Sequence, residues 1–187
     1  DGPVTVVDAA GRTVALERLP RRIVVVGRGP HMALHMLYTF PEGRERLVGI
    51  EAKNATQSDF IVKVDPDFLT NVGSLAANPN AEQILALDPD LVLIKGVALE
   101  ATGEVLAQVA IPVVYLGLET PEQYFQDVAN LGALLGNPAR AEEITAFYRT
   151  RLEERHGLTV LVPDAADREF INAVIYGELA RGVISDD

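Results

Sequence analysis

The sequence predicts a three-layer α/β fold, in which a mainly parallel sheet is covered by helices on both faces. Short, unbroken apolar runs occur at residues 23–26, 47–50, 91–94 and 113–116. Runs of this kind are typical of parallel strands that are buried on both faces. Segments with the helical spacing of apolar residues separate these runs, and turns rich in Gly, Pro and Asn bound them. Strands that alternate with helices in this way indicate a parallel sheet.

A β-hairpin is expected to lead the chain, because residues 4–17 alternate in polarity around the turn pair Ala10-Gly11. The first buried strand breaks at Gly27, and Pro30 suits the first turn of the helix that follows. The elements expected before residue 72 are the hairpin (4–17), a strand (23–26), a helix (30–37), a turn (41–43), a strand (47–50), and a long polar loop (52–71) with one helical turn at most.

Capping signals mark the helices of the second half. Either Asn78 or Asn80 caps a short helix that ends at Asp88, and Thr120 with Gln123 three residues later matches a capping box. The elements that follow the short helix are a strand (91–94), a helix (100–109), a strand (113–116), a helix (121–135), a long connecting helix (138–156), and a terminal unit with a strand (159–162) and a helix (167–180).

Composition excludes several classes of function. The 187 residues carry a formal net charge of −11, which leaves no basic surface for nucleic acid. The absence of cysteine excludes thiol catalysis, disulfides and thiolate metal sites. No apolar run approaches the roughly 18 residues of a membrane-spanning helix. The chain begins at Asp1 with neither an initiator Met nor a basic segment, so we expect a processed or trimmed chain. Such a chain is compatible with export from the cytoplasm.

Two glycines after the first buried strand resemble the start of a nucleotide site. Gly27 and Gly29 fit the dinucleotide fingerprint, but Met32 stands where a third glycine is required. Glu51, at the end of the next strand, lies where a ribose-binding acid is expected. The sequence contains no Lys-Ser or Lys-Thr pair of a phosphate-binding loop. A nucleotide-using enzyme is therefore the weakest of the hypotheses.

His31 and His35 are four residues apart on one helical face, a spacing that can place two imidazoles on one metal ion. The segment HMALH lacks the acidic residue of the zinc-protease motif, and two histidines alone form a partial site. We therefore expect His31 to line the start of the helix, His35 to pack or face solvent, and no metal to bind directly.

Polar residues follow the predicted strands at one edge of the sheet. Arg28 precedes a helix N-terminus, where N–H groups and the helix dipole favour anions, so it can clamp a carboxylate or phosphate. The alternative for Arg28 is a surface arginine paired with an acid. Lys95 follows another buried strand, and Ser74, Gln57 and Glu119 lie in loops that can reach this edge. No nucleophile, base and orienting residue come together, so the pattern indicates binding rather than catalysis.

Larger segments carry a family pattern: RLPRRIVVVGRGPHMALHML, RLVGI, VGSLAANPNAEQILALDPDLVLIKG and IPVVYLGLETPEQYFQDVANLGALLGNPARAEEI. The most specific part is NPN-x-E-x-I-x-A-L-x-P-D-L-V, followed by IPV and ETPE. Over about residues 3–155 the chain resembles the amino-terminal lobe of the helical-backbone (class III) periplasmic binding proteins. That family serves ABC importers of iron-siderophores, haem and cobalamin.

The resemblance implies two lobes joined by a long helix, with a metal chelate held between them. Residues 1–137 would form the chelate-binding lobe and residues 138–156 the connecting helix. Glu82 matches the acid that docks onto the importer's permease; the alternative is a first-turn glutamate favoured by the helix dipole. The ligand-binding residues that the resemblance implies are Arg28, Gly29, Pro30, His31, Gln57, Ser58, Ser74, Lys95 and Glu119.

Residues 157–187 depart from that family, which would continue into a second lobe. Their strand ending in VPD and their helix carrying IYGELARG resemble part of an aspartate/glutamate racemase more than the start of a second lobe. Racemase activity is excluded, because that mechanism uses two opposed cysteines. This unit is a truncated second lobe or a foreign fragment. Its strand either completes the chain's own sheet or pairs with a second copy, and we favour the homodimer.

The sequence therefore predicts a non-enzymatic, extracytoplasmic solute-binding protein of an ABC importer, represented by one lobe and compatible with a lipid anchor. No intrinsic cofactor is expected; an iron-siderophore, haem or cobalamin is the expected ligand. The competing hypothesis is a truncated or engineered chimeric α/β scaffold that binds no ligand.

Overall fold

The computed structural model describes residues 2–51, 59–96 and 100–151. The chain divides into two compact units, Asp1–Ala146 and Phe147–Asp187. The second unit is described only over residues 147–151, so the account below concerns the first unit. The predicted strand at 159–162, the predicted helix at 167–180 and the end of the connecting helix lie outside the described residues.

The first unit is built on a parallel sheet of five strands in the spatial order β5-β4-β3-β6-β7. In chain order these strands are β3 (Ile23–Gly27), β4 (Leu47–Glu51), β5 (Gly73–Leu75), β6 (Leu91–Lys95) and β7 (Val113–Leu116). The chain adds β4 and β5 on one side of β3 and then returns to add β6 and β7 on the other. This reversal creates a topological switch point between β3 and β6, and open α/β sheets bind ligands at the carboxyl ends of strands at such points.

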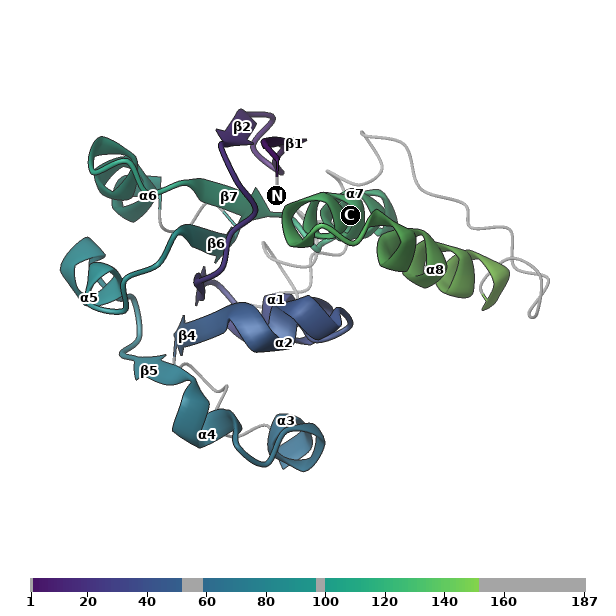
Figure 1. Ribbon diagram of the computed structural model, residues 1–187, viewed down its shortest axis with the longest axis horizontal. Helices are drawn as coiled ribbons and strands as arrows, with labels where there is room; N and C mark the ends of the chain where they lie inside the picture. The colour runs from purple at the N-terminus through teal and green to yellow at the C-terminus, as the bar shows by residue number, and fades with distance from the viewer. Residues whose placement is uncertain (1, 52–58, 97–99, 152–187) are drawn as a thin grey trace, which may run out of the picture. The chain divides into compact units, whose positions relative to one another are not determined.

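Helices cover both faces of this sheet. The helices of the described residues are α1 (Pro30–Leu37), α2 (Pro41–Arg46), α3 (Asp59–Val64), α4 (Phe68–Asn71), α5 (Ala81–Leu85), α6 (Glu100–Gln108), α7 (Pro121–Leu135) and α8 (Pro138–Arg149). Figure 1 shows α1 and α7 on one side of the sheet and α5 and α6 on the other. Alternate strand residues point to opposite faces, so Ile23 joins the hydrophobic cluster of α1 and α7, whereas Val24 joins that of α5 and α6. The three-layer prediction is confirmed.

The leading hairpin is anchored to the sheet at β7 (Figure 1). Its strands β1 (Val4–Val7) and β2 (Thr13–Leu16) pair antiparallel, as the sequence predicts. The Arg12 guanidinium donates to the Val113 carbonyl over 2.9 Å and lies 4.3 Å from the centre of the Tyr115 ring. It also forms an ion pair of 2.7 Å with the buried carboxylate of Asp8. These contacts hold the hairpin against β7.

Within the described residues the other predicted strands and most predicted helices are confirmed, but three predictions between residues 41 and 75 are wrong. Residues 41–46 form helix α2 rather than a turn, because Pro41 begins a helical turn and the following residues continue it. The predicted long loop contains α3 and α4, which bury Ile61 and Phe68 in the core. The segment that includes Ser74 is strand β5 rather than a loop, because it pairs with β4 at the edge of the sheet.

Local capping fixes where two of the helices begin. Asn80 caps α5 with a complete capping box, in which its side chain and that of Gln83 accept from each other's backbone N–H at 2.9 and 3.0 Å. Thr120 caps α7 by accepting from the Gln123 N–H at 3.3 Å. The Gln123 side chain instead accepts from the backbone N–H of Glu119 at 2.9 Å, so the second half of that predicted box is displaced by one residue. In the described part of the chain, none of the helices combines the length and apolarity needed to span a membrane.

Candidate ligand-binding site

The carboxyl ends of β3 and β6 meet at the switch point, where Gly27 lies opposite Lys95. The N–H of Arg28 donates to the Lys95 carbonyl over 3.0 Å. Gly27 has φ 106°, and a Cβ atom there would lie 2.6 Å from the same carbonyl oxygen. Only glycine allows β3 to leave the sheet this close to β6. The turn therefore places Arg28 directly beside the end of the neighbouring strand.

Arg28 and the start of α1 form the first part of the candidate site. Arg28 is exposed and makes no ion pair within the described residues. The described residues therefore provide no acid that pairs with Arg28, which the alternative interpretation of this residue requires. Gly29 caps α1 in the left-handed conformation, at φ 73° and ψ 53°, and offers no side-chain acceptor to the first N–H groups. Pro30 occupies the first helical turn as predicted.

Glu51 fixes the backbone under this turn. Glu51 is 1% exposed, and its carboxylate accepts from the Gly27 N–H at 2.7 Å and from the Asn78 N–H at 2.9 Å. It therefore ties the end of β3 to the loop between β5 and α5. Both carboxylate oxygens are engaged by the chain's own backbone, so Glu51 is a positioning residue rather than a ribose-binding acid.

Lys95 and Glu119 form an ion pair at the same edge. Lys95 ends β6, and its side chain is 5% exposed, whereas the side chain of Glu119, in the loop after β7, is 64% exposed. Gly96 follows with φ 72° and donates its N–H to the Leu116 carbonyl at 2.9 Å, which keeps the two loop starts together. Among the described residues, this edge thus carries an exposed cation, Arg28, and a buried cation, Lys95, with an exposed counter-ion.

Asp127 of α7 holds the loop that carries Glu119. One of its carboxylate oxygens accepts from the N–H groups of Gly117 at 2.9 Å and Leu118 at 3.1 Å. The pKa of Asp127 is raised to about 6, chiefly by burial and to a smaller extent by Asp8, while the two backbone donors and Lys95 oppose the increase. Leu118 has φ 58°, a conformation that non-glycine residues adopt at a cost, and these hydrogen bonds stabilise it.

The two histidines form an edge-to-face ring pair. The rings of His31 and His35 meet edge to face, with centroids 6.2 Å apart and an interplanar angle of 73°. Partial burial lowers the pKa of His35, and the neighbouring His31 lowers it further. No group of three or more metal-ligating side chains occurs among the described residues.

Residues 23–155 match the periplasmic binding protein family, and this match covers most of the chain. The chain belongs to the periplasmic binding protein family. A comparison with curated proteins gave no significant match.

Solved periplasmic binding proteins share the fold of this chain. A TroA-like periplasmic binding protein, FepB, from Veillonella parvula has a TM-score of 0.64 and 24% identity over 85% of this chain and 51% of its own. The siderophore-binding protein BauB, solved with acinetobactin and ferric iron, has a TM-score of 0.63 and 20% identity over 86% and 56%. The catecholate-siderophore-binding protein VctP from Vibrio cholerae has a TM-score of 0.60 and 21% identity over 83% and 55%. This chain spans about half the length of these proteins.

The structure gathers some predicted site residues and separates others. Arg28, Gly29, Pro30, His31, Lys95 and Glu119 lie at or beside the switch point. Ser74 is exposed on the edge strand β5, two strands away from β3. Glu82 is exposed in the first turn of α5, as the docking prediction requires. Gln57 and Ser58 lie outside the described residues. The roles assigned to all these residues stay predictions.

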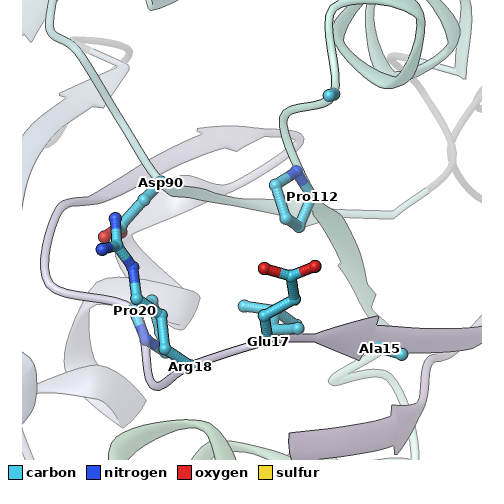
Figure 2. A pocket seen from close by; sticks show the side chains of 8 residues that line it. Ala15, Glu17, Arg18, Pro20, Asp90 and Pro112 are labelled. Carbon is cyan, nitrogen blue, oxygen red and sulfur yellow. The ribbon is translucent and has the colours of Figure 1, made fainter. Parts of the chain in front are cut away.

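The described hollows of the first unit lie elsewhere. One hollow of about 490 Å³ lies between β2 and the amino ends of β6 and β7. In Figure 2, Glu17 projects into this hollow toward Pro112. The amino ends are the opposite end of the sheet from Arg28 and Lys95.

Proposed function

We propose that this lobe captures an anionic metal chelate outside the cytoplasm and presents it to the permease of an ABC importer. Membership of the periplasmic binding protein family supports a substrate-binding role. The observation that carries the proposal is the position of two cations, Arg28 and Lys95, at the switch point of the sheet. The propionates of haem, the phosphate of cobalamin and the catecholate or carboxylate oxygens of many ferric siderophores carry negative charge that such cations recognise.

The proposed mechanism is capture without chemistry. The Arg28 guanidinium clamps a carboxylate, catecholate or phosphate oxygen of the ligand. The first N–H groups of α1, left without a side-chain cap, add favourable electrostatics for the same negative charge. Glu51 and Asp127 keep the two loops in place before the ligand arrives, which lowers the ordering cost of binding. None of these groups forms a nucleophile with a base.

A full cleft needs a second surface, and this chain covers about half the length of its solved relatives. Half a cleft buries less of the ligand, so the lobe alone should bind on the order of micromolar rather than nanomolar. Four further predictions from the sequence stay proposals. They are the docking of Glu82 on a permease, a lipid anchor, the homodimer and the racemase-like origin of residues 157–187.

Titration of the full chain with haem, cobalamin and a panel of ferric siderophores tests the proposal. Ligand absorbance and the protein's Tm are followed together. We expect one anionic chelate to bind and raise Tm, and Arg28→Ala to weaken that binding at least roughly tenfold. Arg18→Ala, which removes an exposed arginine beside the hollow of Figure 2, is the matched control and should bind like wild type. If no ligand binds, the alternative of a scaffold without a ligand is favoured.

A further inference from the structure

We infer that Glu119 is a displaceable internal counter-ion of Lys95, which an anionic group of the ligand replaces on binding. The inference rests on the proposed function and adds a requirement to it, namely that the ligand carries negative charge. A ligand without negative charge cannot take over the role of Glu119 and is discriminated against. Glu119 then inhibits the empty site instead of contacting the ligand, which differs from its predicted role as a ligand-binding residue.

The asymmetry of this ion pair supports displacement. The Lys95 side chain is 5% exposed, and a buried ammonium group is costly without a nearby negative charge. The Glu119 side chain is 64% exposed, so its carboxylate regains water as soon as it turns away. Moving the Glu119 carboxylate away from Lys95 therefore costs Glu119 little free energy, whereas the buried Lys95 ammonium group then requires a replacement anion. An incoming ligand oxygen supplies that replacement.

The loop allows the Glu119 side chain to move while its backbone stays in place. Asp127 holds the N–H groups of Gly117 and Leu118, and the Gln123 side chain accepts from the Glu119 N–H at 2.9 Å. All these bonds are made by backbone groups of the loop. Rotation of the Glu119 side chain breaks none of them, so the exchange of counter-ions needs no rearrangement of the lobe.

The remaining charges near Lys95 make the exchange selective. Asp127 on α7 also lies near Lys95, but its carboxylate is engaged by the N–H groups of Gly117 and Leu118, so it does not take the place of Glu119 as the ion-pair partner. Arg28 is at the end of the adjacent strand and makes no ion pair within the described residues. A ligand with several negative oxygens can therefore reach both cations, whereas a neutral chelate has nothing to exchange for Glu119.

Two chelates of different charge test this inference in the full chain. One is a ferric tris-catecholate, which is trianionic, and the other is a neutral ferric tris-hydroxamate. Glu119→Gln should tighten the tris-catecholate roughly fivefold to tenfold and change the tris-hydroxamate by less than roughly twofold. Glu104→Gln, which removes the same charge from an exposed position on α6, should leave both affinities within roughly twofold. Weaker tris-catecholate binding by Glu119→Gln, or equal tightening by the control, would overturn the inference.

A second readout separates this inference from the proposed function. The ammonium resonance of Lys95 is followed by NMR during titration with inorganic sulfate. In Glu119→Gln it should respond at a sulfate concentration at least roughly fivefold lower than in wild type, whether or not any chelate binds. Equal response in both proteins would overturn the displacement by itself. A chain that binds no chelate but shows the sulfate effect would reject only the proposed ligand class.

Discussion

The carboxyl group of Asp127 should make the stability of the lobe fall as the pH rises from 4 to 7. Its pKa is raised from the ordinary value of 3.8 to about 6, chiefly because burial disfavours the charged form. Between these two values the folded chain keeps a proton that the unfolded chain has released. Because the unfolded state binds fewer protons, the free energy of unfolding decreases as the pH rises through this window.

The size of the effect follows from the difference between the two pKa values. A shift of about two pKa units corresponds to roughly 3 kcal/mol. Asp127→Asn removes the titrating group, and its amide oxygen can still accept from the N–H groups of Gly117 and Leu118. Because pH 4 already lies slightly above the ordinary pKa, the free energy of unfolding of wild type minus that of the variant should fall by roughly 2.4 kcal/mol of this total between pH 4 and pH 7.

Urea unfolding at pH 4, 5, 6 and 7, followed by circular dichroism, measures this difference. The side chain of Asp88 is 94% exposed, so Asp88→Asn removes a charge without burial and should differ from wild type by less than about 0.5 kcal/mol at each pH. A wild-type minus Asp127→Asn difference that stays flat would refute the reasoning. A difference that rises with pH would show that the backbone donors, rather than burial, dominate the pKa.

Three further substitutions test the scaffold of the site. Gly27→Ala should cost roughly 2–4 kcal/mol in urea unfolding, because φ is 106° and the new Cβ would lie 2.6 Å from the Lys95 carbonyl oxygen. Glu51→Gln should cost about 2–3 kcal/mol in the same assay, because its amide has one acceptor oxygen for the two N–H donors. Asn80→Ala should cost about 1 kcal/mol, seen as a drop in Tm of a few degrees. A variant as stable as wild type would show that the contact removed or strained by that substitution does not stabilise the fold as described.

The sheet was largely predictable, because four of its strands are apolar runs buried on both faces. β5 could not be found in this way, since Gly-Ser-Leu carries no β-branched residue and the strand forms by pairing with β4 at the edge. The short helices α2 and α3 also depend on tertiary contacts. Asp65, after α3, accepts from the Tyr38 hydroxyl at 3.0 Å and the Arg44 guanidinium at 2.7 Å. These partners are more than 20 residues away, so no local pattern reveals them.

The candidate site was predictable where strand ends determine it. Parallel neighbours place Arg28 and Lys95 at one edge, which the sequence already implied. The holding role of Asp127 was missed, because its partners Gly117 and Leu118 lie on a different element. The sequence feature that could have revealed this role is the position of Asp127, a charged residue within the apolar stripe of α7. Glu51 was noticed, but only the structure reveals that backbone N–H groups engage both of its oxygens.

The most direct test of the central proposal is an amide NMR map of the lobe's ligand site in the full chain. A trianionic gallium(III) tris-catecholate serves as a diamagnetic substitute for the ferric chelate. The account predicts that the largest shifts occur at the amides of Arg28, Gly96 and Leu118, at the carboxyl ends of β3, β6 and β7. Shifts concentrated instead at Ala15 and Asp90, around the hollow of Figure 2, would contradict it, as would the absence of any shift.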